Sequence, residues 1–213
     1  MSIVKTGLAC YAFVLALLGS ATANATYLYD NVSVASGGVA SASTGDNGPL
    51  ADSFSTRSSG YTLTAVDLLV IADNPADGGS FTVSLLSDNS TSPGSTITMD
   101  TFVDSALSTT LGTFYAPFSN VPLAANTRYW IELSTSNGSL EWSYSQVNNG
   151  IGVANEYNFY AGSVSANAAF TPYQMSVGSA VPERSSWAMM LLGLAGLGFA
   201  NYRTSSQALS VTA

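Results

Sequence analysis

Histidine is absent from this chain of 213 residues, and cysteine occurs once, at Cys10. The absence of histidine removes the commonest general base and the commonest metal ligand together. Because Cys10 lies in a segment that we expect to be cleaved off, we expect a mature protein without disulfides or zinc-thiolate sites. The serines also lack a conventional base, since the only lysine is Lys5. We therefore expect a protein that is not an enzyme and needs no cofactor.

Charged residues are scarce as well. They make up 8% of the chain, against roughly 25% in an ordinary soluble domain. Between residues 26 and 180 only Arg57 and Arg128 are basic, whereas twelve residues are acidic, which gives this part a formal charge of −10. Such a surface repels phosphate backbones, because nucleic-acid binding requires clustered lysine and arginine. Nucleic acid is therefore excluded as a partner.

The first 25 residues have the organisation of a secretory signal peptide. Lys5 supplies a lone positive charge, an apolar run extends from Leu8 to Leu18, and small residues lead to Ala23 and Ala25. The run is much shorter than the ~20 residues that span a bilayer, and the two alanines form an A-x-A cleavage site. We expect residues 1–25 to be removed on export and Thr26 to begin the mature chain.

A second apolar run lies near the other end, in residues 181–203. Trp187 to Ala200 contains no charge, but as a helix its fourteen residues would span about 21 Å, less than the ~30 Å of a hydrocarbon core. Trp187 and Tyr202 bracket the run as interface anchors, and Arg203 follows as the cytoplasmic positive charge. The pattern predicts a marginal C-terminal transmembrane helix, followed by a tail over 204–213.

The residues around this run carry a family resemblance. Val181, Pro182 and Glu183, followed by the WAMMLLG stretch from Trp187, closely resemble the PEP-CTERM sorting segment. The resemblance implies an exported protein that the C-terminal helix holds in the inner membrane until an exosortase-type enzyme processes it near the motif. It also implies an association with exopolysaccharide. Arg184 stands where the family usually has a second proline, and the tail TSSQALSVTA replaces a short arginine-rich end.

Residues 26–180 show the two-residue period of half-buried strands. Apolar side chains alternate with polar ones in Phe81–Leu85, Tyr129–Leu133 and Leu140–Tyr144, and more loosely from Phe170 to Val177, while Val66–Ala72 is apolar almost throughout. Turn-forming clusters separate these stretches, at Asp73–Gly79, Asp88–Ser95, Ser119–Thr127 and Ser134–Ser139. We predict an all-β domain, a β-sandwich or jelly roll of short antiparallel strands. Asn137 and Gly138 suit a hairpin between the strands that carry Trp130 and Trp142.

The order of these stretches is similar to that of the choice-of-anchor R domain, over most of Tyr27 to Val177. The stretches concerned are YTLTAVDLLVIA, FTVSLLSD with the turn Pro93-Gly94 after it, VPLAANTRYWIELS and YQMSV. The resemblance implies a β-sandwich-like domain that is displayed through interchangeable anchors. It implies no particular activity.

Two kinds of binding residue stand out in this domain. Trp130 shares a strand face with Glu132, opposite the apolar face, so we expect it to face solvent and to contact a ligand such as a glycan together with Glu132. Asp73, Asn74 and Asp77 lie in a glycine-containing loop of the kind that can bind calcium, although such residues are also ordinary turn formers. A second loop carries Asp88 and Asn89.

The sequence leaves three hypotheses for function. The first is a non-enzymatic protein of the cell surface or extracellular matrix, with the processing enzyme, the inner membrane and exopolysaccharide as partners. The second is a carbohydrate-binding module that uses the Trp130 face. The third is a glycoside hydrolase with Glu132 and Glu141 as its two carboxylates, although solvated carboxylates of normal pKa are poor acids at neutral pH.

Overall fold

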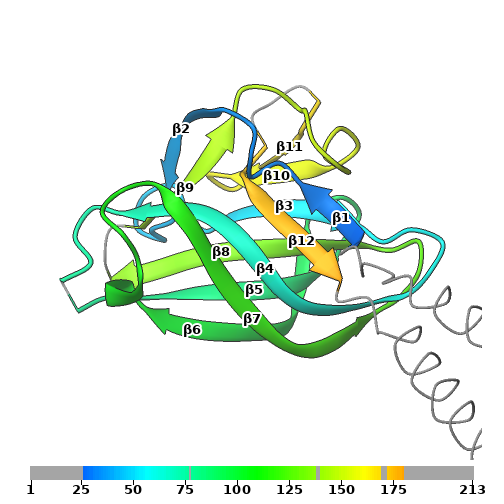
Figure 1. The fold of residues 1–213 in the computed structure, drawn as a ribbon, viewed down its shortest axis with the longest axis horizontal. Helices are drawn as coiled ribbons and strands as arrows, with labels where there is room; N and C mark the ends of the chain where they lie inside the picture. The colour runs from blue at the N-terminus through cyan, green and yellow to red at the C-terminus, as the bar shows by residue number, and fades with distance from the viewer. Residues whose placement is uncertain (1–25, 77, 138–139, 169–171, 180–213) are drawn as a thin grey trace, which may run out of the picture. The chain divides into compact units, whose positions relative to one another are not determined.

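A computed structural model describes residues 26–179 of the chain, except for 77, 138–139 and 169–171 (Figure 1). The predicted signal peptide with Ala23 and Ala25, and the sorting segment and tail from Val181 onwards, lie outside the described residues. Within the described part, no helix is both long enough and apolar enough to span a bilayer.

The described residues form twelve β-strands and one turn of 3-10 helix, η1. All pairings between the strands are antiparallel, so the predicted all-β class is confirmed. The elements are β1 (Thr26–Asp30), β2 (Ser36–Ser41), β3 (Leu50–Ser55), β4 (Tyr61–Ala72), β5 (Ser80–Asp88), β6 (Pro93–Val103), η1 (Asp104–Ala106), β7 (Gly112–Leu123), β8 (Arg128–Asn137), β9 (Leu140–Ser145), β10 (Tyr157–Tyr160), β11 (Ser163–Ala166) and β12 (Met175–Ser179).

The first sheet is built around β4. Its order is β1-β12-β4-β9-β2, and β7 also pairs with β4. Strand β4 pairs with β12 through residues 63–68, with β9 through 70–72 and with β7 through 61–70. The nearly continuous apolar run Val66–Ala72 therefore lies in the central strand of this sheet.

Strand β1, at one edge of this sheet, pairs with β12 over its whole length. The register places Thr26 opposite Ser179 and Asp30 opposite Ser176. In Figure 1 the blue β1 accordingly lies beside the orange β12. The first and last strands of the domain are thus direct neighbours.

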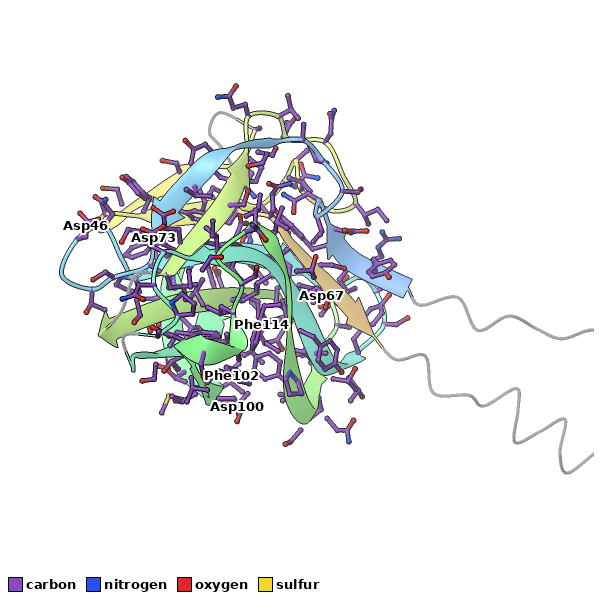
Figure 2. The ribbon with its side chains drawn as sticks, turned by 60° about the vertical axis from the view of Figure 1, so that its left-hand side comes forward. Asp46, Asp67, Asp73, Asp100, Phe102 and Phe114 are labelled. Carbon is purple, nitrogen blue, oxygen red and sulfur yellow. The ribbon has the colours of Figure 1, made fainter. Side chains whose placement is uncertain are left out.

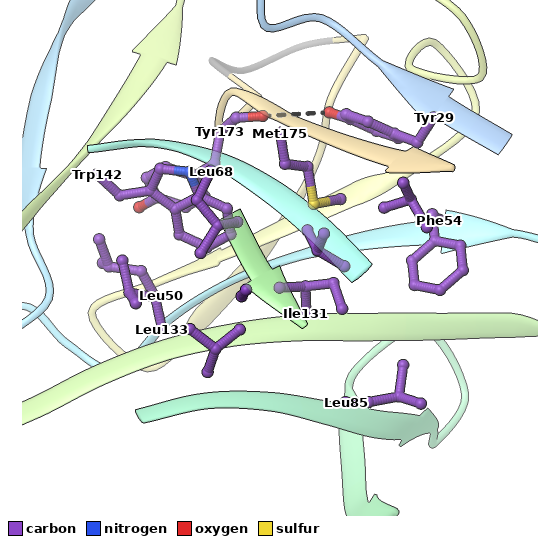
Figure 3. Packing of buried hydrophobic residues seen from close by; sticks show 14 of the residues in the cluster. Tyr29, Leu50, Phe54, Leu68, Leu85, Ile131, Leu133, Trp142, Tyr173 and Met175 are labelled. Atoms are coloured by element: carbon purple, nitrogen blue, oxygen red, sulfur yellow. Dashed lines mark hydrogen bonds between the residues drawn. The ribbon is translucent and has the colours of Figure 1, made fainter. Parts of the chain in front are cut away.

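The second sheet has the order β11-β10-β3-β8-β5-β6, and its inner face covers the first sheet. The predicted alternation holds: Tyr129, Ile131 and Leu133 of β8 are buried in one core cluster together with residues of the first sheet such as Leu68 and Met175. A β-sandwich-like arrangement follows, with the main core between the sheets (Figure 3).

Trp142 is the largest side chain in this main core, and it is completely buried. Its ring stacks on that of Tyr173 at a centroid distance of 4.8 Å, and its indole Nε1 donates a hydrogen bond of 2.9 Å to the carbonyl of Gln174. Because the polar edge of the indole is paired, its burial costs no unsatisfied donor. Trp142 therefore faces inwards between Glu141 and Ser143, as the alternation in Leu140–Tyr144 predicts.

Aromatic rings fill the core between β5, β6 and β7. Phe81 is buried and contacts both Phe102 and Phe114, which contact each other edge to face at a centroid distance of 5.0 Å. Figure 2 shows Phe102 and Phe114 close together, with Asp100 nearby. These rings connect β6, an edge strand of the second sheet, to β7 of the first.

Three expectations about connections were wrong. The strands that carry Trp130 and Trp142 belong to different sheets, so the segment after Asn137 passes from one sheet to the other and is not a hairpin. Strand β8 extends to Asn137, into the predicted turn Ser134–Ser139. Strand β7 extends to Leu123, so half of the predicted loop Ser119–Thr127 is strand.

Candidate functional site

The outer face of the second sheet is the surface on which sequence analysis placed a ligand. The strand register aligns six side chains in one row across it, one from each strand of the sheet. The row runs Met99, Ser84, Glu132, Ala51, Phe159 and Val164, in the strand order β6-β5-β8-β3-β10-β11. We call this set the Glu132 row.

Trp130 lies beside this row, two residues before Glu132 on β8. The expectation that its ring faces solvent was wrong, because Trp130 is completely buried. It forms a second, smaller apolar cluster with Ala51 and Leu86, and side chains of the β10–β11 hairpin pack against that cluster. Alternation had placed Trp130 on the correct face of the sheet, but another layer of side chains covers this part of the face.

A hydrogen bond fixes the Trp130 side chain to Asp88, at the end of β5. Its indole Nε1 donates to Oδ1 of Asp88 at 2.9 Å. The other oxygen of Asp88 accepts a hydrogen bond from the backbone amide of Thr91 at 3.2 Å. Both oxygens of Asp88 thus serve the turn, which includes left-handed residues at Ser90 and Thr91. A stacking role for Trp130 on a ligand is incompatible with this burial.

Glu132 remains partly exposed at the centre of the row. Burial raises the pKa of its carboxyl group above the usual value. Within the described part of the chain, the structure gives this carboxylate no hydrogen bond and no ion pair. Its cross-strand neighbours are the small residues Ser84 and Ala51, which leave the carboxylate accessible and offer it no positive charge.

One end of the face is bounded by an ion pair. Nε of Arg128 donates to Oε2 of Glu156 at 2.9 Å, and Glu156 is almost fully buried. The guanidinium of Arg128 lies over the ring of Tyr157, 4.7 Å from its centroid. The same oxygen of Glu156 accepts a hydrogen bond from Ser53 at 2.6 Å. Arg128 is therefore engaged by these groups of its own chain.

The two carboxylates of the hydrolase hypothesis do not meet. Glu132 lies on β8 in the second sheet, and Glu141 lies on β9 in the first. Each alternates with core residues, so each projects from the outer face of its own sheet, and the core separates them. Retaining and inverting glycosidases need two carboxyl groups about 5–10 Å apart on either side of one bond. This pair cannot provide that geometry.

The loop predicted as a calcium site is only partly described. Asp73 is exposed. Burial is the larger cause of the raised pKa of Glu141, and the negative charge of Asp73 raises this pKa further. Asp77 lies outside the described residues, so the set Asp73, Asn74 and Asp77 stays a prediction. Among the residues that the structure does describe, no three metal-binding side chains form a cluster.

A buried polar network centred on Asp52 was not predicted from the sequence. One oxygen of the Asp52 carboxylate accepts a hydrogen bond from the backbone amide of Tyr173 at 2.7 Å, and the other accepts one from Nδ2 of Asn167 at 2.9 Å. The hydroxyl of Tyr29 lies 3.4 Å from the first oxygen. Burial is the largest influence on Asp52 and raises its pKa well above the usual value, although the hydrogen bonds oppose the shift.

The network continues into the first sheet through Asn31. Its Nδ2 donates to the carbonyl of Tyr173 at 3.0 Å, and its Oδ1 accepts from the amide of Met175 at 2.8 Å. Gln174 donates to the carbonyl of Asn31 at 3.1 Å and accepts a hydrogen bond from Ser143 at 2.6 Å. Every one of these groups is buried, so the network joins β1, β3, β9 and β12 inside the domain. A structural role explains it completely.

A signal for this network was present in the sequence. Leu50, Asp52 and Phe54 alternate on the inner face of β3, so a carboxylate occupies a core position between two apolar residues. Buried carboxylates need hydrogen-bond donors, and here amide groups supply them.

The chain matched none of the known protein-family models and none of the curated proteins with which it was compared.

Proposed function

We propose that this chain is an exported, non-catalytic protein of the cell envelope or extracellular matrix. A C-terminal sorting segment would hold it in the inner membrane, and an exosortase-type enzyme would then process it. One observation carries the proposal. The strands that the structure describes all lie between Thr26 and Ser179, hence between the predicted signal cleavage site and the motif residues Pro182 and Glu183.

The positions of these strand ends matter because processing must leave a complete domain behind. Removal of residues 1–25 takes away none of the strands that the structure describes, and a cut near Glu183 leaves β12 intact. The sparse charge of the domain and its lack of histidine further support a structural or binding role over catalysis. The resemblance of Val181–Glu183 and the run from Trp187 to the PEP-CTERM segment supplies the sorting step.

The test is the intact mass of the protein recovered from a producing cell, with both of its ends sequenced. The proposal expects a mature start at Thr26 and an end near Glu183. A chain that retains residues through Ala213 would contradict the processing step. Replacement of Pro182 and Glu183 by alanine should block the C-terminal cut, whereas Ser185→Ala, outside the motif, should leave it unchanged.

A carbohydrate-binding module is a second candidate function, and the Glu132 row favours it. The row combines the partly exposed carboxylate of Glu132, an acceptor, with the partly exposed ring of Phe159. An acceptor beside an aromatic ring suits a sugar, whose hydroxyls donate hydrogen bonds while its C–H face packs on the ring. Binding of the purified protein to a panel of polysaccharides, measured before and after Phe159→Leu, tests this candidate.

A further inference from the structure

Among the described residues, the carboxylate of Glu132 has no positive partner, and residues 26–180 contain only two basic residues, Arg57 and Arg128. Arg128 is engaged by Glu156 and by the ring of Tyr157. Arg57 follows β3 in an exposed loop. Burial raises the pKa of Glu132, and within the described part of the chain this carboxylate forms no ion pair.

A cationic ligand would supply the missing partner. An ammonium group placed against Glu132 forms a charge-assisted hydrogen bond in surroundings already partly removed from water. The formal charge of −10 between residues 26 and 180 also attracts a polycation over longer distances. Charge complementarity therefore selects an amine over a neutral or acidic ligand.

The neighbours of Glu132 indicate what carries the amine. Phe159 lies in the same row, separated from Glu132 by Ala51 alone. Two strand spacings place their backbones about 10 Å apart, so one ligand can contact both side chains. A partly exposed aromatic ring fits the C–H face of a sugar ring better than it fits a flexible lysine side chain.

We propose that the Glu132 row binds an amine-bearing glycan, with Glu132 as the counter-ion of a protonated glucosamine unit and Phe159 as the surface on which a sugar ring packs. This assignment rests on the proposed envelope or matrix function, which would bring the domain next to polysaccharide. It differs from the site expected from sequence, because Phe159 replaces the buried Trp130 as the stacking ring.

The experiment measures binding of the full-length protein to oligomers of β-1,4-linked glucosamine, with the fully N-acetylated oligomers as the uncharged comparison. Glu132→Gln should weaken binding of the free-amine oligomer at least tenfold. Asp100→Asn is the matched control, because it removes one negative charge from an exposed position of β6 without touching the row. Phe159→Leu keeps an apolar side chain but removes the ring, and it should also weaken binding at least tenfold.

Each result decides the question. Equal binding by Glu132→Gln and wild type would overturn the proposal, as would an equal loss in Asp100→Asn, which would mean diffuse attraction by net charge. Oligolysine that binds as tightly as the glucosamine oligomer, unaffected by Phe159→Leu, would assign the row to a peptide and overturn the glycan. Circular dichroism checks that the variants fold. The terminal processing test is independent, since these substitutions lie far along the chain from both cleavage sites.

Discussion

Replacement of Asp52 by alanine is the sharpest test of what holds the two sheets together. The substitution removes the acceptor for the amide of Tyr173 and for Nδ2 of Asn167, both fully inside the domain. A buried donor left without an acceptor costs about 1–3 kcal/mol, so two of them cost about 2–6 kcal/mol. Relief of the buried carboxylate offsets part of this cost, and we expect a net loss of about 2–4 kcal/mol.

Urea unfolding followed by tryptophan fluorescence measures this loss, because Trp130 and Trp142 are both completely buried and should report unfolding. With a slope of about 2 kcal/mol per M, the midpoint should fall by about 1–2 M. Asp100→Ala, at an exposed position of β6, should change stability by no more than about 0.5 kcal/mol. Equal midpoints for the two variants would refute the account of the network.

The pH dependence gives an independent reading of the same group. Burial raises the pKa of Asp52 in the folded state above its usual value of 3.8. At pH values between the usual pKa, which applies to the unfolded chain, and the raised pKa of the folded protein, Asp52 is protonated only in the folded state. The free energy of unfolding therefore decreases as the pH rises through this window. The wild type should therefore gain stability relative to Asp52→Asn as the pH falls from neutral to about 4. A constant difference between the two across that range would contradict the raised pKa.

Two further predictions concern the backbone and the Trp130 cluster. Gly152 and Gly162 have nearly the same left-handed φ, +76° and +78°, but a Cβ at Gly152 would collide with the carbonyl of Leu28, whereas one at Gly162 meets nothing within 4 Å. Gly162→Ala should therefore lower the free energy of unfolding by about 1–2 kcal/mol, because only the left-handed conformation opposes the new side chain. Gly152→Ala should lower it clearly more in the same urea assay. Equal losses for the two variants would contradict the predicted collision. Trp130→Phe removes the donor and Asp88→Ala the acceptor of one hydrogen bond. The double variant should therefore lose about 0.5–1.5 kcal/mol less free energy of unfolding than the sum of the two single losses. Additive losses would show that this bond contributes nothing to stability.

The sequence predicted the inner faces of the strands well because burial on one side of a sheet imposes a period of two residues. Phe81, Val83 and Leu85 show this period in the sequence and are buried in the structure. The end of β7 was missed because its ladder is irregular. Leu63 pairs with Val121 and Ala65 with Pro117, so the residues between Pro117 and Val121 form a bulge, which looks like a loop in sequence.

The candidate site was less predictable because it depends on contacts between distant segments. Alternation assigned Trp130 to the outer face, but nothing near it in sequence indicates that side chains of β10 and β11 pack against it there. The turn-like pair Asn137 and Gly138 likewise indicates a turn, but it does not indicate which sheet the next strand joins. For Asp52, in contrast, local sequence was sufficient, because its position between Leu50 and Phe54 already indicates a carboxylate on the inner face of β3, although the network was not predicted.

The pairing of β1 with β12 also affects the time course of folding. Strand β1, of five residues, pairs along its length with Met175–Ser179, about 150 positions later, and its last residue Asp30 also bridges to Ile151. As the chain is delivered from its N-terminus, whether from a ribosome or through a translocation channel, this first strand must wait unpaired until almost the whole domain has emerged. Closure of so long a loop is slow compared with local pairing. Completion of the fold is thereby tied to completion of delivery. A chain that stops short of β12 leaves β1 without that strand and leaves residues 63–68 of β4 without their pairing to β12.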